Sequence, residues 1–259
     1  MKRAIWKGTI KIAGEEIAVR MYSAVQDQKV HFRLLHAKDL EPVEQRIVRK
    51  SDGKEVPKDE QRKALPVEAD TAVIVEPDEL ERTAPETSRD IDLCRFVPAS
   101  ALGDQWYDRP YYLGPDKDDQ AYFSLVAALE HQKVIGIARW AMRKKRYVGA
   151  LKAEGGYLML ITLRRADQVL SVSGIDIPAA RQPDDKEVRL AEQLVMSISA
   201  DFEPQSWVDE YRARVMKLIE AKARGVKIVL PKAKPKPAGG GLADMLQKSL
   251  AMAKEKKVA

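Results

Sequence analysis

The residues with the most distinctive chemistry in this 259-residue chain are lysines and arginines gathered in two short stretches. One stretch, 139–152, holds six of them and no aspartate or glutamate. We select from it Arg139, Arg143, Lys144, Lys145 and Arg146, and from the second stretch Arg46, Arg49, Lys50 and Lys54. Cations at this density bind the oxygens of an anionic polymer, largely through the release of its counterions. A solvated basic surface without a ligand is the alternative.

The basic charge of the chain is unevenly distributed. Residues 211–259 carry 13 Lys and Arg against three Asp and Glu, although the whole chain has a net charge of only +6. Residues 65–104 are acidic, with ten Asp and Glu against three Arg. Segregation of this kind favours binding of a polyanion by one face or tail and its repulsion elsewhere.

Catalytic and cofactor sites are not evident in the sequence. The single cysteine, Cys94, excludes an internal disulfide, and the three histidines are not at metal-ligand spacing. There is no glycine-rich phosphate loop and no hydrolase motif. Carboxylates such as Glu76, Glu79 and Glu81 leave a nuclease-like pair open, but a solvated acidic surface is the simpler interpretation. We therefore expect no catalytic residue, metal, cofactor or small-molecule substrate.

Membrane insertion and secretion are also not expected. The most apolar stretch, 157–163, is too short to span a bilayer. Charged residues interrupt the N-terminus where a signal peptide needs an apolar run. The expectation is a cytoplasmic protein.

The elements that would position these cations are first strands and then helices. Alternating apolar residues predict strands at 6–12, 17–21, 30–34 and 45–49, and a β-branched run predicts a buried strand at 71–75. Gly14 and Asp52-Gly53 mark hairpin turns. A helix is predicted over 118–130, and long strands over 133–142 and 156–163.

The last third is predicted to be helical. From Asp184, apolar residues including Val188 and Val195 share one helix face. A second helix is predicted from Pro204 to Gly225, with Val208, Tyr211 and Val215 on one face. Residues 231–241 have the composition of a linker, and a last short helix carries an apolar stripe of Leu242, Met245, Leu246 and Leu250.

The order of several short blocks resembles the bacterial and archaeal Ku proteins, which bind DNA double-strand ends. The blocks cover nearly the whole chain, and the most specific one is Tyr107-Asp108-Arg109-Pro110-Tyr111-Tyr112-Leu113-Gly114-Pro115. The others include Arg3-Ala4-Ile5-Trp6-Lys7-Gly8, Leu35-His36-Ala37-Lys38-Asp39, Gly136-Ile137-Ala138-Arg139-Trp140 and Asp201-Phe202-Glu203-Pro204. Residues 40–68 diverge from the family pattern, and the basic hairpin lacks the cysteine that many relatives have there.

The resemblance implies an α+β fold and a domain plan. Residues 1–183 would form the β-barrel core with a protruding basic arm, 184–230 a helical arm, 231–241 a flexible linker and 242–259 a short amphipathic segment. Two copies would form a ring threaded by DNA. The partners would be double-stranded DNA ends, a second copy and a multifunctional ATP-dependent DNA ligase, at the nucleoid.

The resemblance also assigns roles to the residues named above. The nine cations would contact DNA, and Val188, Val195, Val208, Tyr211 and Val215 would form the dimer interface. Leu242, Met245, Leu246 and Leu250 would recruit the ligase. The alternative is a general basic nucleoid or nucleic-acid-binding protein without preference for ends.

Overall fold

A computed structural model describes residues 3–68, 71–117, 119–176 and 182–225 of the chain. It divides into two compact units, Met1–Gly174 and Ile175–Ala259. Within the described ranges, no helix has the length and apolarity needed to cross a bilayer.

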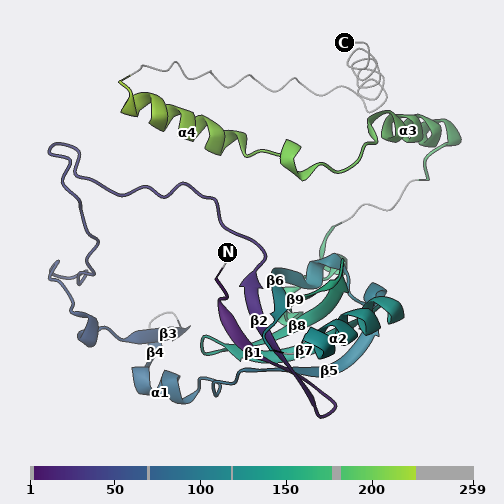
Figure 1. Ribbon diagram of the computed structural model, residues 1–259. Coiled ribbons are helices and arrows are strands. Elements are labelled where there is room, and N and C mark those ends of the chain that lie inside the picture. Colours follow the sequence, from purple (N-terminus) through teal and green to yellow (C-terminus); the bar gives the residue numbers. More distant parts are fainter. Residues whose placement is uncertain (1–2, 69–70, 118, 177–181, 226–259) are drawn as a thin grey trace. The chain divides into compact units, whose positions relative to one another are not determined.

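The first unit is built on a closed barrel of seven strands (Figure 1). Around the barrel, the order is β1 (Trp6–Ile12), β2 (Glu15–Ser23), β6 (Tyr107–Pro115), β9 (Tyr157–Leu163), β8 (Lys145–Glu154), β7 (Val134–Met142) and β5 (Asp90–Pro98). Neighbouring strands are antiparallel except β1 and β5, which are parallel where the barrel closes. The barrel and its helices confirm the predicted α+β class.

The core lies inside the barrel because alternate residues along each strand point inward. Ile10, Met21, Ile91, Leu151 and Leu160 are all fully buried there. The β1–β2 hairpin predicted around Gly14 is confirmed, with Ala13 and Gly14 both at positive φ (47° and 94°). Two such residues form the tight turn whose twist matches that of antiparallel strands.

Helix α2 (Asp119–Gln132) confirms the helix predicted over 118–130 and packs against the barrel. Its buried residues, Tyr122, Leu125, Val126 and Leu129, fall on one face as their spacing predicts. The Tyr122 hydroxyl donates to the Leu113 carbonyl at 2.6 Å and accepts the Leu158 amide proton at 2.9 Å. The helix is thereby bonded to both β6 and β9.

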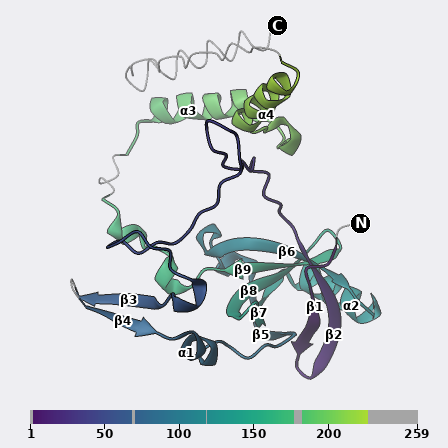
Figure 2. The same cartoon turned by 90° about the vertical axis from the view of Figure 1, so that its left-hand side faces the viewer.

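Between β2 and β5 the chain makes a long excursion over residues 24–89, which we call the arm (Figure 2). It contains a 3₁₀ turn (Lys58–Glu60), a two-stranded antiparallel sheet of β3 (Lys63–Glu68) and β4 (Thr71–Val75), and the short helix α1 (Pro77–Arg82). The turn predicted at Asp52-Gly53 is confirmed: Gly53 has φ +70°, and the Arg49 amide donates to the Lys54 carbonyl at 2.8 Å.

Three sequence predictions for the arm are wrong. Neither 30–34 nor 45–49 forms a regular strand: an isolated bridge at Leu35 follows the first range, and the second contains only the bridge at Val48. The run 71–75 is a strand, β4, but Ile74 is 60% exposed, so it is not buried. Alternation marks residues that can lie on a sheet face, but a strand also needs a neighbour, and burial needs a covering layer.

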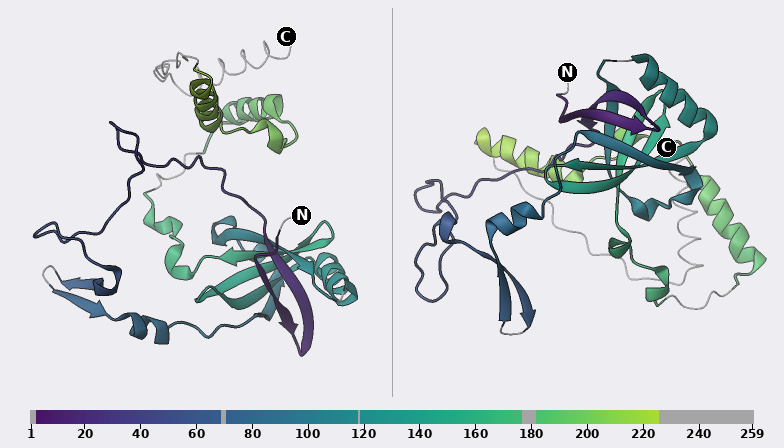
Figure 3. Two further views of the ribbon diagram at one scale, coloured as in Figure 1. Left: turned by 60° about the vertical axis from the view of Figure 1, so that its left-hand side comes forward. Right: turned by 90° about the horizontal axis from the view of Figure 1, so that it is seen from below.

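The second unit contains α3 (Asp185–Ile198), a 3₁₀ turn (Pro204–Ser206) and α4 (Glu210–Ala223), all visible in Figure 3. The helical pattern predicted from Asp184 is confirmed, and the Asp184 side chain caps α3 by accepting the amide protons of Lys186 and Glu187. The second predicted helix starts later than expected: Pro204 opens only the 3₁₀ turn, and the Asp209 carboxylate caps α4. Gly225 follows α4 with φ +73°, the left-handed conformation expected of a helix C-cap.

Candidate nucleic-acid interface

The acid-free stretch 139–152 lies in a β-hairpin formed by β7 and β8. Strand β8 was not predicted from the sequence. Arg143 and Lys144 are the two turn residues of the hairpin, with φ +52° and +61°, and Met142 pairs with Lys145. Left-handed backbone at both positions is usually occupied by glycine or asparagine. Two long cationic residues therefore occupy strained positions at the tip of a barrel hairpin.

Arg139 and Arg146 lie on the outer face of the same hairpin. Arg139 pairs with Asp92 on one side and Val148 on the other, and Arg146 pairs with Ala141. The neighbours Ala138 and Trp140 are buried in the core, so the side chain of Arg139 projects outward. By this register, Arg139 and Arg146 are diagonal neighbours on adjacent strands, about 7–8 Å apart.

The guanidinium groups of Arg139 and Arg146 are free to bind an anion. Both residues are exposed, and neither side chain forms an ion pair or a hydrogen bond with the residues that the structure describes. They line a groove of about 610 Å³ together with Arg165, Tyr147 and Val148. Three acids also line it. The carboxylate of one of them, Asp90, already forms an ion pair with the Lys11 ammonium group, with an N–O distance of 3.0 Å. Unpaired arginines on a shallow outer surface suit phosphate oxygens, which they can bind in a bidentate fashion.

The cations of the arm hairpin divide into paired and unpaired groups. Arg46 forms ion pairs with Glu44 and Glu55, and hydrogen bonds to these carboxylates raise its pKa further above the ordinary range. Arg49 Nη1 lies 3.6 Å from the Asp52 carboxylate oxygen Oδ2, so these two residues also form an ion pair. Lys50 and Lys54 are exposed and have no ion-pair partner in the described ranges. The two lysines are therefore the cations that this hairpin offers without first breaking an ion pair.

Comparison with known proteins places this barrel in a family. Residues 12–190 match the model of the family Ku, described as the Ku70/Ku80 beta-barrel domain. The chain belongs to the Ku family. The resemblance seen in the sequence is thus confirmed, and the matched residues include most of the barrel and the whole arm.

Curated bacterial relatives resemble the chain over almost its full length. It is 38% identical to "Non-homologous end joining protein Ku 2" of Geotalea uraniireducens, an alignment covering 95% of this chain and 96% of that protein. It is 36% identical to "Non-homologous end joining protein Ku" of Anaeromyxobacter sp. (99% and 88%) and 33% identical to that of Coxiella burnetii (95% and 92%). These names connect the relatives with non-homologous end joining.

Sequence reasoning missed one cation of the Ku barrel groove. Arg165 lines it beside Arg146, and its ion pair with Asp167 has a distance of 3.1 Å. The absence of acids was the signal that selected the cations of 139–152, and Asp167 removes Arg165 from such a run. The consecutive bases Arg164-Arg165 after a predicted strand were the available alternative signal.

The candidate dimer residues of this Ku chain lie in or beside α3 and α4. Val195, Val208 and Tyr211 are well exposed, Val188 is 39% exposed, and Val215 is half-buried. Val208 precedes α4 rather than lying within it. The candidate ligase-recruiting residues, Leu242, Met245, Leu246 and Leu250, lie outside the described residues.

The carboxylates considered for a nuclease site have separate structural contacts. Glu76 caps α1 and pairs with Arg62 at 2.8 Å, and Glu79 closes the capping box by accepting the Glu76 amide at 2.9 Å. Glu81 forms an ion pair with Lys144. In the described part of the chain, no three His, Cys, Asp or Glu side chains gather closely enough to hold a metal ion. The geometry thus favours structural roles for these three acids.

Proposed function

We propose that this chain binds double-stranded DNA ends without regard to sequence, as a ring-shaped homodimer, and protects or bridges them during non-homologous end joining. It would also recruit and stimulate an ATP-dependent DNA ligase. The observation that carries the proposal is that two guanidinium groups, those of Arg139 and Arg146, lie on the outer face of a Ku-family barrel without an ion-pair partner among the described residues. Membership in a family whose relatives are named for end joining supports the choice of DNA as the anion.

The geometry favours sequence-independent binding. The candidate cations lie on strands and tight turns, where they can reach phosphate and sugar. Contacts to the backbone fix the position of a protein on a duplex but do not read base edges. Binding should therefore weaken steeply with salt and vary little with sequence.

Ring formation would explain a preference for ends, because a closed loop cannot pass onto a duplex that has none. The arm supports a second copy as partner. Phe32 is 70% exposed and Leu40 is 67% exposed, and Leu34 and Ile47 are also exposed. In the proposed dimer, a second copy would cover these large apolar side chains and remove them from water.

The test compares one duplex in three forms: open at both ends, blocked at both ends by bulky caps, and covalently closed. Competition in a gel shift at moderate salt should show binding to the open form and strong loss with the other two. Equal binding to all three would contradict the ring and favour a general nucleoid protein.

Disruption of the apolar face of α3 should dissociate the dimer. Val195→Asp would place an unpaired carboxylate in the proposed interface, and its desolvation should raise the dimer dissociation constant at least about tenfold. Sedimentation at low micromolar concentration measures the mass. Gln193→Asp, two residues away in α3, is the charge-matched control and should remain dimeric. If both variants stay dimeric, this helix face is not part of the interface.

Loss of the last segment should separate end binding from ligase recruitment. A chain ending before Gly239 should keep most of its affinity for open ends but no longer stimulate the ligase, since the apolar stripe predicted from the sequence is the proposed docking element. Leu246→Asp should reproduce the loss of stimulation in the full chain, whereas Gln247→Asp should not. Full stimulation by the shortened chain would assign recruitment to another surface.

A further inference from the structure

An ion pair connects the arm with the barrel hairpin. Lys144, at the tip of the β7–β8 turn, donates to the carboxylate of Glu81 in α1, 63 residues earlier in the chain. This hydrogen bond and the nearby charge lower the pKa of Glu81, so the carboxylate is ionised whenever the pair forms. A helix of the arm is thus linked to the candidate DNA-binding cluster.

The helix that carries Glu81 is well defined locally. Pro77 occupies its first turn, Glu76 and Glu79 form a reciprocal capping box, and Arg62 pairs with Glu76 at 2.8 Å. Between α1 and the hairpin turn lies a cavity of about 660 Å³, lined by Leu80, Glu81 and Lys144 among others. Leu80 and Glu81 of α1 therefore line the same space as Lys144 of the hairpin turn.

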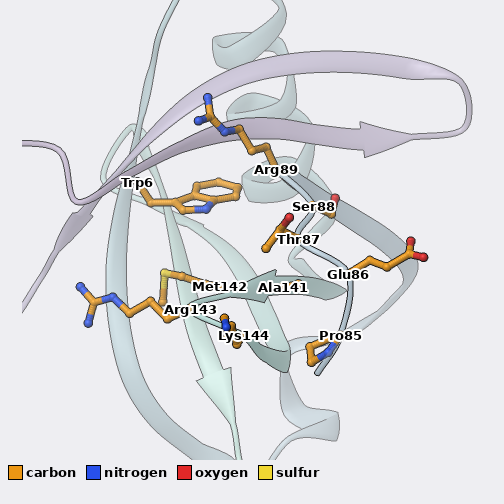
Figure 4. A pocket seen from close by; sticks show the side chains of 10 residues that line it. All are labelled: Trp6, Pro85, Glu86, Thr87, Ser88, Arg89, Ala141, Met142, Arg143 and Lys144. Atoms are coloured by element: carbon orange, nitrogen blue, oxygen red, sulfur yellow. The ribbon is translucent and has the colours of Figure 1, made fainter. Parts of the chain in front are cut away.

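The two turn residues are directed differently. In Figure 4, Arg143 extends away from the chain segment 85–89 that leads out of the arm, whereas Lys144 lies between Arg143 and Pro85. The side chains of Arg139, Arg143, Lys145 and Arg146 form no ion pair or hydrogen bond with other described residues. Lys144 is therefore the member of the cluster that is already engaged by an acid.

We propose that Glu81 is a positioning residue that withdraws Lys144 from the phosphate-binding cations and anchors α1 of the arm at the barrel hairpin. The proposal rests on the DNA-binding function above and divides the cluster predicted from the sequence. Arg139, Arg143, Lys145 and Arg146 contact phosphate, and Lys144 holds the arm. A lysine paired with a carboxylate can neutralise a phosphate only after releasing that acid.

The expected effects are modest because both side chains are exposed, 63% for Lys144 and 70% for Glu81. Exposed pairs contribute little, so the release of Lys144 should tighten DNA binding only about two- to fivefold. The salt dependence gives a clearer readout. One additional phosphate contact should steepen the slope of log affinity against log salt by about 0.9.

The experiment titrates an open-ended duplex at several salt concentrations with four full-length proteins: the wild type, Glu81→Gln, Lys144→Gln and the double variant. Glu81→Gln should bind more tightly and with the steeper slope, because Lys144 is then free. Lys144→Gln and the double variant should keep the wild-type slope. Glu60→Gln is the matched control, since it removes another exposed acid of the arm that neither pairs with Lys144 nor lines the groove, and it should leave the slope unchanged.

A second readout follows the anchor directly. Hydrogen exchange of the Leu80 amide in α1 and of the Thr83 amide at its C-cap should be faster in both single variants and in the double variant. The charge-swapped Glu81→Lys/Lys144→Glu protein should restore slow exchange. Rescue by the swap would not be expected if either residue acted only through local helix stability.

Two results would overturn the proposal. If Lys144→Gln makes the slope shallower by as much as Arg146→Gln does, Lys144 contacts DNA in the wild type. If α1 exchanges equally fast in all the proteins, the pair does not anchor the arm. The DNA-binding proposal fails separately, when Arg146→Gln leaves the slope unchanged or when open ends are not bound.

Discussion

Simultaneous replacement of Arg139, Arg143, Lys145 and Arg146 by glutamine should lower the affinity for open-ended duplex by about 10²–10³-fold at near-physiological salt. Each lost phosphate contact removes about 0.9 from the slope of log affinity against log salt, and this accounts for roughly fivefold in affinity at that salt. Four contacts together give the upper end of the range. Lys144 is left unchanged because Glu81 engages it.

The measurement is fluorescence anisotropy over a salt series, with dimer mass checked by sedimentation. The matched control replaces four cations of the second unit, Lys186, Arg189, Lys217 and Lys222, which lowers the net charge equally. That control should retain most of the affinity and nearly the wild-type slope. Equal losses in the two proteins would attribute the effect to overall charge and remove the β7–β8 hairpin from the DNA path.

Sequence alone predicted the parts of the barrel where alternation is uninterrupted. Strands β1, β2, β7 and β9 were predicted, but β5, β6 and β8 were not. A bulge between Leu93 and Arg95 shifts the register of β5, and another between Tyr107 and Pro110 shifts that of β6. Such an extra residue breaks the period of two on which the prediction depends. In β8, the buried pair Gly149-Ala150 offers little contrast between the inner and outer faces.

The arm shows a different limit of sequence reasoning. Apolar residues such as Phe32 and Leu34 alternate with polar ones, yet they form no strand and remain exposed. The alternation predicts which side chains can be buried, but it does not predict whether they are buried by the same chain or by another one. In a protein that forms a ring of two copies, a second chain would supply it.

The candidate site was located in the sequence by its charge. The sequence did not predict which of its cations is paired with an acid. The lack of acids in 139–152 selected the hairpin, because unneutralised cations are visible in the sequence. The acid that engages Lys144 lies 63 residues away in α1, and only the fold brings the two together. Likewise, no sequence pattern shows that Arg139 projects outward next to the buried Trp140 rather than inward as a paired, buried arginine.

Replacement of Tyr122 by alanine should destabilise the barrel more than any substitution considered above. The ring is only 1% exposed and belongs to the core cluster, so its removal should lower the free energy of unfolding by about 3–5 kcal/mol. Burial raises the pKa of the Tyr122 phenol, which therefore stays neutral and donates to the Leu113 carbonyl. Tyr122→Phe should cost about 1–3 kcal/mol, since the buried Leu158 amide then loses its acceptor.

Chemical denaturation of the purified protein measures both losses, and Phe123→Ala is the control. Phe123 is the next residue in α2 but is 52% exposed, so its loss should destabilise the barrel far less than that of Tyr122. Similar losses for Tyr122→Ala and Phe123→Ala would show that α2 does not depend on the buried tyrosine. Well below the unfolding transition, the Tyr122→Phe protein should bind DNA with the wild-type salt slope. Its hydroxyl bonds to β6 and β9, whereas Arg139 and Arg146 project from the outer face of β7 and β8, so stability can change while the phosphate contacts remain.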